Sequence, residues 1–269
     1  MFLNTKVMNK KGIKLEEITD MYNKGISPIQ IAEHFDCNVS NITKRLKKAG
    51  IIHIKDYKSR RLPTRINRHK VNEHFFENID TEEKAYFLGL MFADGSVSRN
   101  QFYLKMKDED IIVKFKGALE CDYPIIYREN PWISYCLTVS SQKLCNFLIN
   151  LGCVPNKTRI IRLPVLEKSL YRHFIRGFFD GDGCLQLQDK KYHCRFDLTS
   201  ASKKFLEDLR PIINQHSKTN GSLNKERKYE VWHLNYNGHQ VQQILDWLYK
   251  DATVYLNRKY IKYRLLSSP

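Results

Sequence analysis

A short segment rich in small residues occurs twice in this chain and ends each time in Asp-Gly. Residues 87–95 are FLGLMFADG, and residues 175–183 are IRGFFDGDG. Each copy places two small residues four positions apart, on one face of an expected helix, where they let two backbones approach closely; these are Gly89, Ala93, Gly177 and Gly181. The repeat therefore predicts two helices that pack against each other.

Each copy also carries an acid at the expected C-terminal end of its helix. Asp94 and Asp182 occupy matching positions, each before a glycine suited to the left-handed C′ conformation. A carboxylate is favoured at a helix N-terminus and disfavoured at the C-terminus. Two acids at the same unfavourable place indicate that a divalent cation holds them together. The alternative is that they only terminate helices in Asp-Gly turns.

Both segments resemble the LAGLIDADG motif of homing endonucleases, in the form that carries two motifs in one chain. The resemblance covers roughly residues 80–265. At the sixth motif position the first copy departs from the pattern with Phe92, whereas the second keeps an acid, Asp180. The family uses the eighth-position acid, Asp94 or Asp182, to bind metal. The resemblance therefore implies a DNA endonuclease with magnesium as cofactor, for which manganese can substitute.

From about residue 80 the chain repeats one order of helical and strand-like patterns. We predict an α/β (α+β) fold, a pseudo-twofold duplicated αββαββα domain with antiparallel sheets, which the resemblance implies are saddle-shaped. A small all-α domain precedes it. We expect a helix-turn-helix domain at residues 1–52, a basic linker at 53–75 and an endonuclease domain at 76–269. The endonuclease domain is expected to consist of two halves, about 76–165 and 166–269.

The first domain has the pattern of three short helices within residues 14–49. Pro28 follows the plausible N-cap Ser27, and Ser40 is the expected N-cap of the third helix. That helix resembles the helix that enters the major groove in helix-turn-helix proteins, with exposed side chains expected at Asn41, Thr43, Lys44, Arg45 and Lys47. The alternative is a helical bundle that contacts protein.

Strongly basic residues continue into the linker. Arg60, Arg61 and Arg65 are expected to lie along DNA phosphates without reading the base sequence. The alternative is a disordered, solvated linker, and both can hold because such segments often become ordered on binding.

The strand patterns point to a DNA-binding sheet face in each half. Apolar residues alternate with long polar ones, so one face of each sheet is expected to be buried and the other to contact the major groove. The polar positions are Lys105, Lys107, Gln186, Gln188 and Arg195. An ordinary solvated sheet face is the alternative for any single strand.

The formal net charge of +16 favours a nucleic-acid partner. Seven cysteines without a CxxC pair are expected to be reduced, mostly buried thiols of an intracellular protein, in a bacterium, a phage-infected cell or an organelle. The chain begins Met-Phe and has no terminal His-Asn pair, so we expect a free-standing or intron-encoded enzyme.

Lysines at places corresponding to Lys157 and Lys259 line the active site of similar enzymes. The resemblance therefore predicts that these two side chains assist Asp94 and Asp182 in catalysis. Asp108 and Ser200, at the end of the second strand of each half, are weaker candidates for ordering water.

The combined prediction is a monomeric, site-specific endonuclease that cuts both strands of duplex DNA with divalent metal. One rival is a transcription regulator that keeps the scaffold without catalysis, although such proteins typically lose the metal acids. The other is an RNA maturase, which the helix-turn-helix disfavours because A-form grooves do not admit such a helix.

Overall fold

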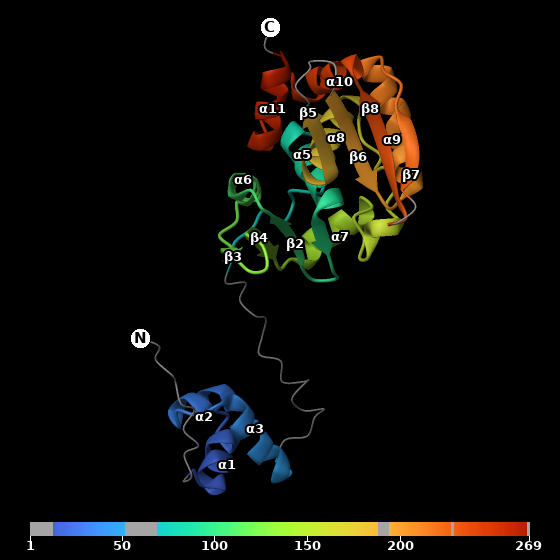
Figure 1. Cartoon of the computed structure of the whole chain (residues 1–269). Coiled ribbons are helices and arrows are strands. Elements are labelled where there is room, and N and C mark those ends of the chain that lie inside the picture. The colour runs from blue at the N-terminus through green and yellow to red at the C-terminus, as the bar shows by residue number, and fades with distance from the viewer. Residues whose placement is uncertain (1–12, 52–68, 188–193, 227–228, 268–269) are drawn as a thin grey trace. The chain divides into compact units, whose positions relative to one another are not determined.

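The computed structural model describes residues 13–51, 69–187, 194–226 and 229–267. The chain divides into two compact units, 1–68 and 69–269, each of which is considered by itself (Figure 1).

The described residues of the first unit form three short helices: α1 (Leu15–Asn23), α2 (Pro28–His34) and α3 (Val39–Lys48). Helix α2 begins as predicted, with a capping box between Ser27 and Gln30. Helix α3 begins two residues earlier than expected, because the side chain of Asn38, and not Ser40, caps it. A small core joins the helices and consists of Ile18, Ile31, Ala32, Ile42 and Leu46.

The second unit repeats one order of elements. Its first half comprises α5 (Glu82–Ala93), β1 (Gly95–Val97), β2 (Phe102–Met106), α6 (Glu109–Ala118), β3 (Ile125–Arg128), β4 (Ser134–Val139) and α7 (Gln142–Asn150). Two short 3-10 helices, η1 (Lys157–Arg159) and η2 (Lys168–Leu170), lie between the halves.

The second half follows the same plan. It comprises α8 (Tyr171–Asp182), β5 (Gly183–Leu187), β6 (Cys194–Ser200), α9 (Lys203–Ser217), β7 (Ser222–Glu226), β8 (Val231–Asn237) and α10 (His239–Tyr249). One further helix, α11 (Asn257–Ser267), has no counterpart in the first half among the described residues and was not predicted.

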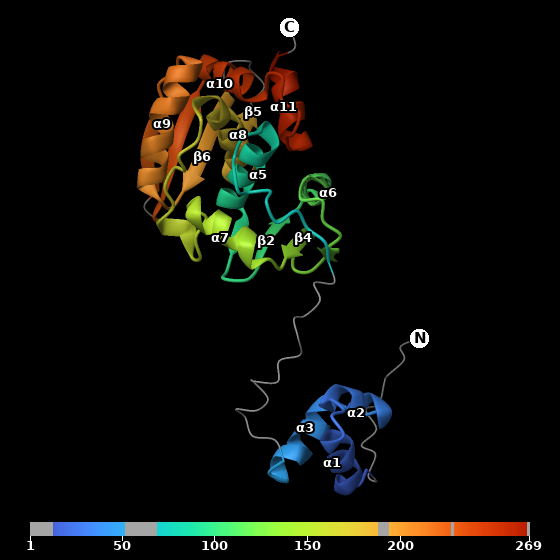
Figure 2. The same ribbon diagram turned by 180° about the vertical axis from the view of Figure 1, so that it is seen from behind.

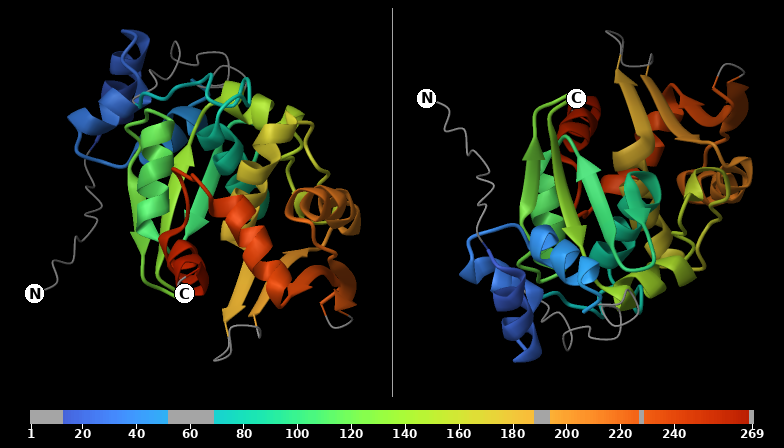
Figure 3. Two further views of the ribbon diagram at one scale, coloured as in Figure 1. Left: turned by 90° about the horizontal axis from the view of Figure 1, so that it is seen from above. Right: turned by 90° about the horizontal axis from the view of Figure 1, so that it is seen from below.

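Each half forms a four-stranded antiparallel sheet. The strand orders are β1-β2-β4-β3 and β5-β6-β8-β7, so the two sheets have one topology. Helices α9 and α10 cover one face of the second sheet, and α5 and α8 lie between the two sheets (Figures 1 and 2). End-on views show a sheet on either side of this central pair (Figure 3). The duplicated α/β fold is confirmed.

Alternating burial follows the predicted strand pattern. Phe102, Leu104 and Met106 of β2 are buried, whereas Lys105 and the flanking Lys107 are exposed. Because consecutive side chains of a strand point to opposite faces, one face of this sheet joins the core and the other meets solvent.

The boundary between the units lies earlier than expected. Residues 69–75, predicted as linker, pack on the second unit: the Asn72 amide donates to the Leu119 carbonyl at 2.9 Å, and Phe75 and Phe76 are buried in the core. None of the seven cysteines forms a disulfide, and four of them are buried. Within the described ranges, no helix combines the length and apolar character needed to cross a membrane.

Candidate active site

Helices α5 and α8 touch through their backbones. A Cβ atom on Gly89 would lie 2.1 Å from the carbonyl oxygen of Phe174, and one on Gly181 would lie 2.4 Å from the Cβ of Ala93. Real Cβ atoms do not approach other atoms so closely, so only glycine permits this packing. The predicted contact between the two repeated helices is confirmed.

The glycines after the two acids are needed for a different reason from the one predicted. Neither Gly95 nor Gly183 has the positive φ of a left-handed C′ residue, and each begins a strand. A Cβ on Gly95 would meet the Met91 backbone at 2.6 Å, and one on Gly183 would meet the Phe179 carbonyl at 2.5 Å. At both glycines the strand begins so close to the last turn of the preceding helix that there is no room for a side chain.

The two acids meet where the paired helices end. Asp94 is the C-cap of α5, and Asp182 is the last residue of α8. A Cβ on Gly181 would lie 2.9 Å from the Asp94 carboxylate, which shows how closely α8 approaches this acid. Both side chains reach solvent, yet the protein removes much of their hydration. This desolvation, reinforced by the charge of Asp94, raises the pKa of Asp182 to about 6.

A lysine lies beside each acid. The Lys157 ammonium donates to the carbonyls of Ala93 and Gly95, which flank Asp94. In the second half, Lys259 donates to the Gly183 carbonyl at 2.7 Å. Each lysine thus contacts the glycine that follows its acid, although Lys157 lies on η1 and Lys259 on α11. The structure brings together the four residues predicted to form the active site.

The surroundings of Lys259 differ from those of Lys157. Its side chain is only 3% exposed and also donates to the carbonyls of Phe179 and Asp180. Burial lowers the pKa of this ammonium to about 8, whereas the negative charge of Asp180 opposes that shift.

A cleft of about 520 Å³ opens beside Asp94 and Gly181. Its lining is both charged and apolar, and comprises Asp94, Lys105, Met106, Lys107, Asp108, Trp132, Ile133, Ser134, Gly181 and Arg258. Asp108, a weaker candidate for ordering water, accepts from the Arg258 guanidinium at 3.1 Å. Ser200 is buried, and its hydroxyl accepts a hydrogen bond from the Ser202 amide. It is not among the residues that line the cleft.

Asp180, two residues before the acid of the second motif, is fully buried and does not line the cleft. Its carboxylate accepts hydrogen bonds of 2.7 Å from Tyr86, 2.7 Å from Tyr249 and 2.8 Å from the Leu256 amide. In the first half the matching position holds Phe92, whose ring packs against Phe174. Asp180 therefore joins both halves to the segment that leads into α11.

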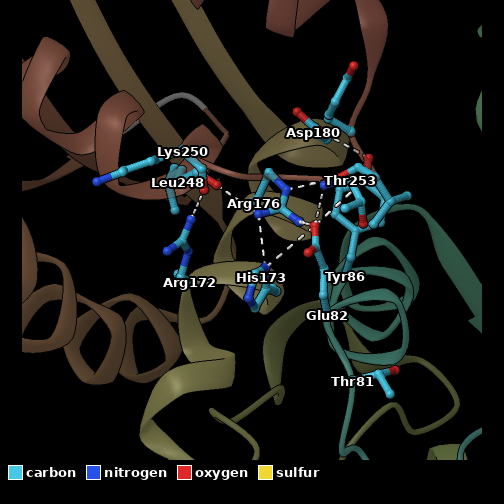
Figure 4. A network of polar contacts seen from close by, with 12 residues as sticks. Thr81, Glu82, Tyr86, Arg172, His173, Arg176, Asp180, Leu248, Lys250 and Thr253 are labelled. Atoms are coloured by element: carbon cyan, nitrogen blue, oxygen red, sulfur yellow. Dashed lines mark hydrogen bonds and ion pairs between the residues drawn. The ribbon is translucent and has the colours of Figure 1, made fainter.

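Arg176 extends this buried network (Figure 4). Its guanidinium donates to Glu82 at 2.6 Å, to the Leu248 carbonyl at 2.7 Å and to the Val254 carbonyl at 3.0 Å. Glu82 in turn accepts from the Thr253 amide at 2.8 Å. Side chains from α5 and α8 thus fix the backbone just before α11, and so fix where Lys259 enters the site.

The predicted DNA-contacting side chains of the sheets have different surroundings. Lys105, Lys107 and Gln186 are exposed as expected. Arg195 is half exposed, but its guanidinium donates to Asp197 at 2.8 Å and also to Asn235. Gln188 lies outside the described residues.

The candidates of the first unit also differ in exposure. Asn41, Lys44 and Lys47 are exposed on α3. Thr43 is half-buried and donates to the Val39 carbonyl at 2.9 Å, and the half-buried Arg45 donates to the Ile13 carbonyl at 2.6 Å. These two were predicted to be exposed, and that prediction is wrong because each side chain donates a hydrogen bond to a backbone carbonyl of its own unit. Arg60, Arg61 and Arg65 lie outside the described residues.

Family models match both halves. Residues 83–152 match the WhiA LAGLIDADG-like domain, and residues 169–245 match the LAGLIDADG-like domain. Among solved structures, the homing endonuclease I-WcaI bound to its DNA recognition sequence has a TM-score of 0.51 at 13% identity, covering 78% of this chain and 97% of that one. At this level of sequence identity, the similarity between the two structures shows a shared fold.

The curated relatives match this chain over only a segment of their own sequences. A probable translation initiation factor IF-2 of Methanocaldococcus jannaschii is 28% identical over 266 residues, which is 87% of this chain and 20% of that protein. The RNA polymerase subunit Rpo1C of the same organism is 29% identical over 134 residues, or 48% of this chain and 15% of that protein. The chain thus spans about a fifth or less of these relatives. Together with the repeated fold, these matches show that each half of the second unit is similar to LAGLIDADG-like domains.

Proposed function

We propose that this protein is a metal-dependent endonuclease that hydrolyses both strands of duplex DNA at a specific site. The observation that carries the proposal is the meeting of two carboxylates, Asp94 and Asp182, at the ends of two helices in backbone contact. Because each half supplies one acid and one lysine, a single chain offers two sets of groups for two phosphates. The proposed enzyme therefore acts as a monomer.

The residues present fit a divalent cation. In the part of the chain that the structure describes, no group of three or more His, Cys, Asp or Glu side chains is placed to hold a metal. Two carboxylates suffice for magnesium, which takes few protein ligands and keeps several waters. Desolvation, and then the charge of Asp94, raises the pKa of Asp182, and a cation bound beside the two carboxylates would offset both effects. Bound there, magnesium or manganese would activate water and stabilise charge on the phosphate.

The lysines supply positive charge on either side of the acids. Lys157 and Lys259 are held by backbone carbonyls, so their ammonium groups are oriented before substrate binds. A preorganised cation stabilises the charge that develops on a phosphate and its leaving oxygen. Each lysine would serve the phosphate next to its own acid.

DNA binding is supported by charge and by the exposed strand residues. The net charge of +16 suits a polyanion, and Lys105, Lys107 and Gln186 are exposed. Lys and Gln side chains suit the edges of guanine and adenine. The three-helix unit, with Asn41, Lys44 and Lys47 exposed on α3, is proposed to add a second contact as a helix-turn-helix module.

The curated relatives support a self-contained activity. A translation factor and an RNA polymerase subunit have different tasks, yet each contains a segment similar to this chain in 20% or less of its length. A segment shared by such different proteins is independent of the task of either.

A cleavage assay tests the proposal. A plasmid that carries the DNA flanking the protein's own gene is incubated with magnesium and the wild type, Asp94→Asn or Asp182→Asn. The wild type is expected to linearise it and both variants to lose that activity. Binding by the variants should stay within about tenfold of wild type, or ~1.4 kcal/mol. Glu207→Gln, which alters an exposed ion pair on α9, is the matched control and should cut normally. Normal cutting by either Asp variant would refute the assignment.

A DNA-binding protein without catalysis is the second candidate. The match of residues 83–152 to the WhiA LAGLIDADG-like domain favours it for the first half. Specific binding to a target, with no cutting in magnesium or manganese, would decide for this candidate.

A further inference from the structure

The turn between β3 and β4 places two large apolar side chains beside the cleft. Trp132 is 74% exposed and Ile133 is 54% exposed, and both line the cleft that also contains Asp94. Exposure of a tryptophan to water is unfavourable, and adjoining exposed apolar groups mark surfaces that bind a partner.

The rest of the cleft is suited to a polyanion. Lys105, Lys107 and Arg258 line it together with Trp132. Arg258 also pairs with Asp108 at 3.1 Å, which offsets one of the negative charges. A positive groove with an aromatic side chain in its wall is the arrangement that binds nucleic acid, where phosphates meet the cations and a base meets the ring.

The second half repeats the feature. Tyr229 precedes β8 by two residues, as Trp132 precedes β4 by two, and its side chain is 62% exposed. An exposed aromatic therefore occurs at the matching turn of both halves. An accidental exposed side chain would not be expected to follow the internal duplication.

We propose that Trp132, supported by Ile133, inserts against a base step of duplex DNA lying in the cleft. The inference rests on the proposed DNA-binding function and adds to it a residue that deforms the duplex next to the acids. Apolar side chains that insert at a base step separate neighbouring bases and bend the duplex. Such a bend would bring the scissile phosphates down toward Asp94 and Asp182.

Tryptophan fluorescence tests this contact directly. The chain has three tryptophans. Trp232 lies 4.9 Å from the Lys203 ammonium, and Trp247 stacks on His216 at 5.4 Å, so neither lines the cleft. A Trp232→Phe, Trp247→Phe variant of the full chain keeps Trp132 as its single tryptophan. Random-sequence duplex DNA is added with calcium in place of magnesium, and binding is followed separately by the anisotropy of the labelled duplex.

Stacking predicts that emission from Trp132 is quenched as DNA binds and that acrylamide no longer reaches the ring. Trp132→Ala in the otherwise native chain should weaken duplex binding about tenfold or more, whereas Trp132→Phe, which keeps an aromatic face, should bind within about threefold of wild type. Trp247→Phe is the matched control and should leave binding unchanged.

Duplex binding without any change in the emission or accessibility of Trp132 would overturn the inference while leaving the proposed function standing. Equal binding by Trp132→Ala and wild type would overturn it as well. Absence of any duplex binding would instead remove the proposed function, and the inference with it. Quenching and shielding of Trp132 on binding would support the inference and would leave the proposed chemistry to the cleavage assay, because this experiment contains no magnesium.

Discussion

A Cβ atom on Gly177 would lie 1.9 Å from the carbonyl oxygen of Tyr86. The clash would be with backbone, which cannot swing aside as the end of a flexible side chain can. The residue at this position therefore sets the separation of α5 and α8, and with it the separation of the two acids.

Gly177→Ala is expected to destabilise the protein by ~1–3 kcal/mol, since it overpacks a tight contact. Cleavage should fall further than the loss of folded protein explains, because Asp182 moves away from Asp94. Gly117→Ala in α6 is the control: no atom lies within 4 Å of the added methyl, and alanine favours a helix by ~1 kcal/mol. Urea denaturation and a cleavage assay measure the two effects. Equal stability of the two variants would contradict the prediction.

Asp182→Asn is expected to raise the melting temperature of the metal-free protein at pH 7. The folded protein holds the Asp182 proton more tightly than the unfolded chain does, so stability falls as pH rises from the ordinary pKa of 3.8 to about 6. The amide removes this effect. Scanning calorimetry at pH 7 should show the gain, and magnesium should raise the melting temperature of wild type but not of the variant. A variant that melts below wild type would count against an unfavourable carboxylate pair.

Cleavage should depend on pH through the same group. Because the pKa of Asp182 is about 6, metal binding and cutting are expected to rise with pH between about 5 and 7. Raising the magnesium concentration should shift the rise toward lower pH, since metal competes with the proton. A rate profile at several metal concentrations measures this, and a midpoint unaffected by magnesium would exclude competition at this acid.

Asp180→Ala is expected to cost ~3 kcal/mol or more, although this acid lies only two residues from Asp182. Three buried donors lose their acceptor, and Lys259 loses its neighbouring negative charge. Tyr249→Phe, which removes one of the three hydrogen bonds, should cost about 1 kcal/mol. Urea denaturation of both variants tests the ranking. An Asp180→Ala protein as stable as wild type would refute the role of the buried network.

Lys44→Ala with Lys47→Ala is expected to weaken DNA binding and flatten its dependence on salt. Each lost phosphate contact lowers the slope of log K against log salt by about 0.9. Lys24→Ala is a fair control because Lys24 is also exposed on the same unit but pairs with Asp20 at 2.7 Å. Titrations at several salt concentrations distinguish the two. Identical slopes would show that α3 does not contact phosphates.

Sequence patterns alone predicted most of the fold. Duplication of the Asp-Gly segment implied two equivalent halves, and alternation such as Phe102, Leu104 and Met106 gave the buried face of a strand. Helix α11 was missed because its positions mix charged and aromatic residues without a clear apolar stripe. Of its residues, only Lys259 is buried.

The site was less predictable than the fold. Sequence placed Asp94 and Asp182 at helix ends, but it could not show that the following glycines are needed for close approach and not for a positive φ. It separated Asp182 from Asp180, because only Asp182 has a matching acid in the first copy, but it could not show that Asp180 is buried. Lys157 and Lys259 were singled out by family resemblance alone, since spacing gives no reason to prefer them among 45 basic residues.

The hydrogen bond from Tyr86 to Asp180 also restricts how this protein can be re-engineered. Tyr86 belongs to the first half and Asp180 to the second, whereas the position of the first half that corresponds to Asp180 holds Phe92. In a chimera built from two copies of the second half, both copies would carry this aspartate, one of them in place of Phe92. Neither copy would carry Tyr86, which donates the hydrogen bond in the native chain. Exchange of either half for a foreign one would therefore require the tyrosine and the aspartate to be transferred as a matched pair.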